Sequence, residues 1–247
     1  MGFFNRLFGA GGGPAANNPE PDEPKPEFPY ELLRVRGADA VEQCLAWRKE
    51  WRGNFTPIIN GTAEDFRLLI EIWDEVKDSP QELVKRSQTV ELQQWFEKRL
   101  GGFPVDDLMD ASAWNTKSGG RGDFLVVADI LTRKVHPSVW VAKIPTGQPH
   151  EVPAYLKLGD WNACPAAQEH VAVWRYWQEK YGAEIFCVTG ATIEATVARP
   201  PVEKEQCYAL AREQFAYCDD IVTQGVESID ALAATLRSGK SWYFWWD

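Results

Sequence analysis

The chain finishes with Trp242-Tyr243-Phe244-Trp245-Trp246-Asp247, five consecutive aromatic residues followed by a carboxylate. Chain ends usually fray, and exposed aromatic side chains promote aggregation. The sequence therefore predicts that this stretch is a buried strand that closes the fold.

Two helices with aromatic faces are predicted to cover that strand. One runs over 39–51 with Ala40, Cys44, Trp47 and Trp51 on one face. The other runs over 164–181, where His170, Trp174, Trp177 and Tyr181 repeat the spacing 130 residues later, and both lead into a glycine-bounded strand. Either an internal duplication gives two related halves with a cleft between them, or a common helix-then-strand pattern occurs twice.

Hydrophobic periodicity and turn residues predict an α+β fold, a mixed or antiparallel sheet flanked by aromatic-striped helices. The predicted strands are 30–36, 55–60, 124–131, 139–144, 154–158, 184–189, 193–198 and 242–246. The other predicted helices are 63–77, 80–100, 203–217 and 228–236. We expect 124–131 to pair with 139–144 as a hairpin, and Pro165 to occupy the first position of its helix.

Composition divides the chain into three parts. Residues 1–27 are rich in proline, glycine and acidic residues, which predicts a disordered tail. Residues 28–110 form a helix-rich α+β part, and 111–247 form a C-terminal α+β domain. The alternative is that 28–247 is one compact unit. Phe3, Phe4, Leu7 and Phe8 could contact a membrane or partner, or belong to an end without a role.

Charge and cysteine usage narrow the function classes. The net charge is −10 with a pI near 4.9, which argues against a nucleic-acid binder and against docking on anionic lipid. No apolar run is long enough to span a membrane. Five cysteines without a CxxC pair indicate a reducing compartment, so we expect a cytoplasmic protein. The acidic surface would suit a basic protein partner, although solubility alone also explains it.

Several motifs in the last hundred residues resemble a bacterial family known only as domain of unknown function 4253. They are Gly159-Asp160-Trp161-Asn162-Ala163-Cys164-Pro165, His170, Tyr181-Gly182-Ala183-Glu184 and the terminal aromatic stretch. The resemblance runs from about Leu156 to the last residue. It implies a C-terminal α+β domain, and it brings no established activity.

The candidate catalytic residues are Asp160, Cys164 and His170. A thiol at a helix N-terminus can be activated, with histidine as its base. In one continuous helix, however, Cys164 and His170 would lie roughly 9 Å apart along the axis and on different faces, so the two alone would form neither a dyad nor a metal site. The alternative is structural: a turn, a cap and a core histidine.

The candidate binding residues are Trp161, Asn162, Glu169, Asp219 and Asp220, and no cofactor or metal is predicted. The leading hypothesis is a non-catalytic bacterial binding protein of immunity or accessory type that engages a basic protein. The alternative is a small hydrolase with a cleft near Asp160, Cys164 and His170.

Overall fold

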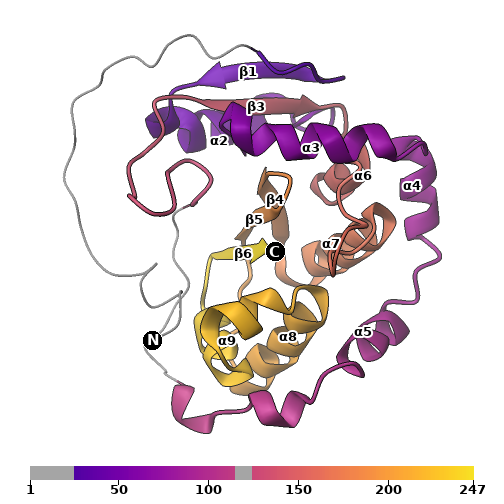
Figure 1. Ribbon diagram of the computed structural model, residues 1–247, viewed down its shortest axis with the longest axis vertical. Coiled ribbons are helices and arrows are strands. Elements are labelled where there is room, and N and C mark those ends of the chain that lie inside the picture. The colour runs from indigo at the N-terminus through magenta and orange to yellow at the C-terminus, as the bar shows by residue number, and fades with distance from the viewer. Residues whose placement is uncertain (1–24, 115–123) are drawn as a thin grey trace.

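The computed structural model describes residues 25–114 and 124–247, which build a six-stranded sheet in the order β1-β3-β2-β4-β5-β6 (Figure 1). The strands are β1 (Glu31–Val35), β2 (Thr56–Gly61), β3 (Val139–Ile144), β4 (Ala183–Val188), β5 (Thr192–Val197) and β6 (Ser241–Trp245). Every neighbouring pair is antiparallel except β2 and β4, which are parallel. The predicted α+β class with a mixed sheet is confirmed.

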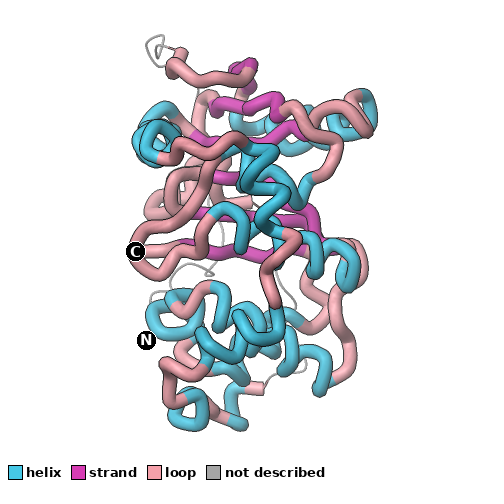
Figure 2. The backbone as a smooth tube through the Cα atoms, turned by 90° about the vertical axis from the view of Figure 1, so that its right-hand side faces the viewer, coloured by secondary structure: helices cyan, strands magenta, loops and turns pink. Residues whose placement is uncertain are grey.

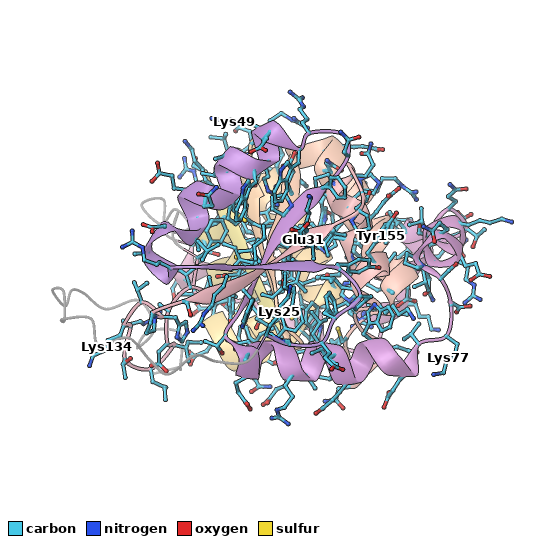
Figure 3. All side chains as sticks on the ribbon, turned by 90° about the horizontal axis from the view of Figure 1, so that it is seen from above. Lys25, Glu31, Lys49, Lys77, Lys134 and Tyr155 are labelled. Carbon is cyan, nitrogen blue, oxygen red and sulfur yellow. The ribbon has the colours of Figure 1, made fainter. Side chains whose placement is uncertain are left out.

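The sheet draws strands from both sides of residue 110. Strand β3 lies between β1 and β2, although it follows them by about eighty residues of chain. Seen from above, β1 with Glu31 crosses the top of the molecule between α2 (Ala40–Glu50), which carries Lys49, and α3 (Ala63–Glu75), beyond which Lys77 lies (Figure 3). The proposed division into 28–110 and 111–247 stays a prediction.

Helices cover both faces of the sheet, and the strands form one column in side view (Figure 2). The remaining helices are α4 (Pro80–Ser87), α5 (Leu92–Leu100), α6 (Val152–Leu156), α7 (Ala167–Tyr181), α8 (Lys204–Tyr217) and α9 (Ile229–Leu236). The neighbouring residues Ile58 and Ile59 of β2 point to opposite faces. Ile58 joins the main core with α3, α7 and α8, and Ile59 joins a second core with α2.

The terminal aromatic strand has the predicted place in the fold. Trp242, Phe244 and Trp246 are buried and alternate with the half-buried Tyr243 and Trp245. The rings of Trp174 and Trp177 on α7 contact those of Trp242 and Phe244, with Trp177 stacked on Phe244 at 5.7 Å. The other aromatic pair, Trp47 and Trp51, instead stack on each other at 5.0 Å, and Trp47 packs against the second core.

The two helix-then-strand units meet at the centre of the sheet. Helix α2 leads into β2 and helix α7 leads into β4, and these two strands are the parallel neighbours. Their helices lie on opposite faces. A two-fold axis that runs parallel to β2 and β4, between them, would relate two such units. The internal duplication itself stays a prediction.

Four local predictions are wrong. The single helix predicted over 80–100 is two helices, α4 and α5. Residues 124–131 form turns joined by one bridge, Ala128 to Val135, because β3 pairs with β1 and β2 instead. Residues 152–156 form helix α6 rather than a strand. Helix α7 begins at Ala167, so Cys164 and Pro165 precede it.

Helix starts that depend on a local side chain are mostly as predicted. Thr62 and Asp65 form a capping box at α3, and Ser228 Oγ accepts the backbone N–H of Ala231 at α9. Asp39 precedes α2, but its carboxylate pairs with Arg36 instead of capping the helix. Within the described ranges, no helix is long and apolar enough to cross a membrane, and the Phe3–Phe8 segment lies outside those ranges.

Candidate functional site

The loop between α6 and α7 has an unusual backbone. Lys157, Asp160 and Asn162 have φ values of 51°, 67° and 46°, in the left-handed region that side chains with a Cβ rarely adopt. Gly159 has φ 103°, and a Cβ at this position would lie 1.8 Å from the carbonyl oxygen of Pro165. Such conformations persist where surrounding contacts fix them, and they concentrate at functional sites.

This loop brings Cys164 back over the first turn of α7. The carboxylate of Glu169 accepts the N–H of Ala166, which fixes the start of the helix after Pro165. Cys164 Sγ lies 3.4 Å from His170 Nε2. The predicted separation of these two residues is therefore wrong, because it assumed that Cys164 was already helical.

A chain of buried polar groups continues from His170. Its Nδ1 contacts the hydroxyl of Tyr217 at the end of α8, and Trp174 Nε1 donates to the same hydroxyl at 2.9 Å. Indole nitrogen can only donate, so the Tyr217 oxygen accepts from Trp174, and of its two partners only His170 Nδ1 can accept the hydroxyl proton, which assigns that proton to the Nδ1 contact. The imidazole proton then lies on Nε2 and faces the sulfur of Cys164. We call these four residues the Cys–His–Tyr–Trp chain.

Burial keeps this chain neutral. His170, Trp174 and Tyr217 are 0% exposed and Cys164 is 5% exposed. Burial, followed by the charge of Arg99, lowers the pKa of His170 to about 3. Burial raises the pKa of the Cys164 thiol, with smaller contributions from Cys218 and Asp160. The two shifts pull the donor and acceptor pKa values apart, so the proton stays on sulfur.

Acidic groups gather at the surface next to this chain. Asn162 Nδ2 donates to the backbone oxygen of Asp247 at 2.8 Å, and the N–H of Asp247 donates to Asp220 Oδ2 at 3.1 Å. Burial raises the pKa of the half-buried Asp219, and Asp220 raises it further. Asp160 and Asp247 are exposed. We call Asp160, Asp219, Asp220 and Asp247 the acidic edge.

Asp219 and Asp220 occupy a more favourable position than the sequence predicted. They follow the end of α8, where a helix dipole opposes negative charge. However, a helical segment (Ile221–Val226) starts directly after Asp220, and the backbone oxygen of Asp219 accepts the N–H groups of Val222 and Thr223. The two carboxylates therefore lie at the N-terminal side of the next helical turn.

Arg99 at the end of α5 joins the loop to α8. Its guanidinium donates to the backbone oxygens of Ala216 and Ala163 and lies over the ring of Trp95. Its positive charge also lowers the pKa of Asp219, against the larger effect of burial. No sequence pattern indicates this role, because α5 is distant in the chain from both segments it connects.

The structure brings most of the sequence-predicted site residues to one place. Cys164 and His170 are in contact, Asn162 and Asp220 are linked through Asp247, and Glu169 serves as the helix cap. Trp161 is half-buried against the main core. Tyr217 was missed as a polar partner because the sequence predicted it only as the last residue of the helix over 203–217. Over residues 25–114 and 124–247, His, Cys, Asp and Glu side chains form no group suited to a metal ion.

These features define an α+β domain in which a neutral polar chain supports an acidic surface loop. Residues 140–247 match the family model described as Domain of unknown function (DUF4253), which confirms the resemblance seen in the sequence. The match includes β3, the loop, α7 and the terminal aromatic strand. Comparisons with curated proteins and with solved structures gave no match.

Proposed function

We propose that the chain is a non-catalytic binding protein that engages a basic protein partner through the acidic edge. The observation that carries this proposal is the carboxylate of Asp220, which is held in place next to Asp219 and the backbone of Asp247. Asp220 is held by the N–H of Asp247, and Asp247 in turn by Asn162. Charged groups held in place by the backbone lose little conformational freedom when a partner binds, which favours complementary charge.

The state of the Cys–His–Tyr–Trp chain supports binding over catalysis. A nucleophilic cysteine needs a thiolate and access to substrate, and a general base needs a free lone pair. Burial raises the pKa of the Cys164 thiol and leaves the side chain 5% exposed, and Tyr217 contacts Nδ1 of His170. The chain is thus better suited to holding the loop than to transferring a proton.

The partner class follows from the charge of the whole protein. With a net charge of −10, the chain would attract a basic partner over distances of roughly a Debye length. We propose an immunity or accessory role in a bacterial cytoplasm, in which the acidic edge covers a basic surface of that partner.

The test uses two pairs of adjacent aspartates. The chain carrying Asp219→Asn and Asp220→Asn is used to capture proteins from its source cells, at low and at high salt. The control carries Asp106→Asn and Asp107→Asn, an exposed adjacent pair on another segment with the same change in net charge. We expect one stoichiometric basic protein with the unchanged chain and the control, and capture weakened roughly tenfold with the acidic-edge variant. Equal loss with both variants would contradict a role for this edge.

A hydrolase remains a second candidate because of one contact, the 3.4 Å approach of Cys164 Sγ to His170 Nε2. Catalysis by this pair would require the loop to open and the thiol to ionise. Cys164→Ala tests it directly. A hydrolytic activity that is abolished by this change, with unchanged unfolding midpoint, would support the enzyme, whereas partner capture that survives the change would support the binding protein.

A further inference from the structure

A second buried ionisable group lies on the opposite side of the sheet from the Cys–His–Tyr–Trp chain. Glu194, in the middle of β5, is 2% exposed. Its Oε1 accepts the N–H of Leu125 at 2.6 Å, and its Oε2 accepts the N–H of Val126 at 3.0 Å. Buried carboxylates are rare without a paired cation, and here backbone donors from a distant segment take that place.

The segment held by Glu194 packs on the sheet at its inner end, where Phe124 and Val126 are buried in the second core, and its outer part makes few contacts with the other described residues. We call residues 124–137 the flap. Phe124 stacks on Phe186 of β4 at 4.5 Å, and Pro137 accepts the N–H of Gly37. The outer part is open to solvent, with Leu131 80% and Val135 51% exposed. Lys134 lies at the outer margin of the molecule (Figure 3). Low contact density of this kind allows a segment to detach without global unfolding.

We propose that Glu194 is a proton-linked latch, which holds the flap on the sheet when protonated and favours its release when ionised. The direction follows from burial. With the flap closed, water is excluded and the charged form is penalised, although the two N–H donors offset part of the penalty. With the flap detached, water reaches the carboxylate and the penalty disappears. The closed flap therefore binds the proton more tightly.

The pKa of Glu194 agrees with this direction. Burial raises the pKa of Glu194 to about 7, although hydrogen bonds from Leu125, Val126 and Cys187 lower it in part. An open flap would return it toward the ordinary value of 4.5. Linkage then makes the opening constant rise about tenfold per pH unit between these two values and level off above 7, roughly 300-fold in all.

Ionisable side chains from β4, β6 and α2 lie around Glu194. On β4 the thiol of Cys187 contacts it, and burial raises the pKa of that thiol well above its usual range. On β6 the phenol of Tyr243 faces it, with a pKa that burial also raises. From α2, Arg48 is committed to Glu184 and to the backbone oxygen of Ile185. These thiol and phenol groups keep their protons across the range in which Glu194 titrates.

The flap itself carries four groups with charge or a titratable proton. Asp129 accepts the N–H of Thr132 within the turn, and hydrogen bonds from Thr132 lower its pKa. The others are Arg133, Lys134 and His136, and Arg133 lowers the pKa of Tyr243. His136 is the histidine of the flap, so its contribution needs a control.

Amide hydrogen exchange on the full chain tests the latch. Protection of the Leu125 and Val126 amides, corrected for intrinsic exchange, is measured from pH 5 to 8.5. We expect it to fall about tenfold per unit up to pH 7 and then to level, while the amide of Val141 in β3 stays protected. Glu194→Gln should remove the pH dependence, whereas Glu205→Gln, which removes an exposed carboxylate, and His136→Gln should keep it.

Two outcomes would overturn the proposal. If the protection of the Leu125 and Val126 amides is constant or rises with pH, opening of the flap is not linked to the loss of a proton. If Glu194→Gln shows the same pH slope as the unchanged chain, the pH dependence belongs to another group. If Glu194→Gln does not fold, the carboxyl carbon of Glu194 is titrated by NMR in the unchanged chain. A midpoint near 7 shared with the Leu125 and Val126 amide shifts supports the latch, and a midpoint below 5 excludes it.

Discussion

Replacing Tyr217 by phenylalanine tests whether the Cys–His–Tyr–Trp chain stabilises the fold through its hydrogen bonds. The hydroxyl is the shared partner of His170 Nδ1 and Trp174 Nε1. Phenylalanine keeps the ring, and with it the edge contacts to Trp177 and Phe244 at 5.0 Å each. Apolar burial is therefore preserved, and the change isolates the polar contribution.

The expected cost follows from the two groups that lose their partner. A buried polar group left unpaired costs about 1–3 kcal/mol. A change of His170 tautomer would not restore the balance, because a proton on Nδ1 would also lack an acceptor. Two such groups give an expected loss of roughly 2–6 kcal/mol, a large share of the stability of an ordinary domain.

Urea unfolding followed by tryptophan fluorescence measures this loss. The midpoint should fall with an unchanged slope, because the same surface is exposed on unfolding. Tyr30→Phe is the matched control, since that hydroxyl donates to one backbone oxygen, of Tyr155, in a partly buried place. A Tyr217→Phe loss no greater than that of the control would show that the chain contributes little, and the argument for its structural role would be wrong.

Three further predictions address the loop, the flap and the imidazole. Gly159→Ala should lower the free energy of unfolding, measured by chemical denaturation, by roughly 2–4 kcal/mol, because its Cβ would overlap the oxygen of Pro165 at a positive φ. Gly53→Ala is the control: Gly53 has φ 85° with nothing within 4 Å of the added Cβ, so the loss should be only about 1 kcal/mol. The pKa of Glu194 is raised on folding, so its contribution to stability is complete below pH 4.5 and is lost as pH rises through 7. Relative to Glu194→Gln, the unchanged chain should lose about 3 kcal/mol over that range, and a gain would contradict the assignment. Nitrogen NMR of His170 should show one neutral tautomer, protonated on Nε2, from pH 5 to 8; a charged imidazolium at pH 6 would refute the burial argument.

Much of the fold was predictable because its signals are local. The terminal aromatic strand, the α7 stripe and the Thr62 and Ser228 caps depend on residues within a turn or two of chain. The wrong hairpin prediction has its cause in tertiary contacts. Residues 124–131 have a strand-like composition, but β3 already has neighbours on both sides, and the buried carboxylate of Glu194 holds the segment as a turn instead.

The candidate site was predictable in its residues but not in its geometry. Cys164 and His170 were singled out from their types and surroundings, and the distance between them was misjudged because Pro165 was placed inside the helix. The helix starts two residues later than predicted, at Ala167 instead of Pro165, and this shift lets Cys164 fold back onto His170. The contacts of Arg99 and Tyr217 join segments far apart in the chain, so no spacing rule could have indicated them.

The groups of the Cys–His–Tyr–Trp chain are buried and neutral, whereas the carboxylates of the acidic edge lie toward the surface. Near neutral pH the thiol of Cys164 and the imidazole of His170 carry no charge, so the Cys–His–Tyr–Trp chain adds nothing to the net charge of −10. The acidic edge lies outside this buried chain, so one of its carboxylates can change while the hydrogen bonds of the chain are kept. We therefore expect Asp219→Asn to be neutral or slightly stabilising, because burial and Asp220 already penalise that charge. Retained stability together with lost partner capture would show that this carboxylate is kept for recognition rather than for folding.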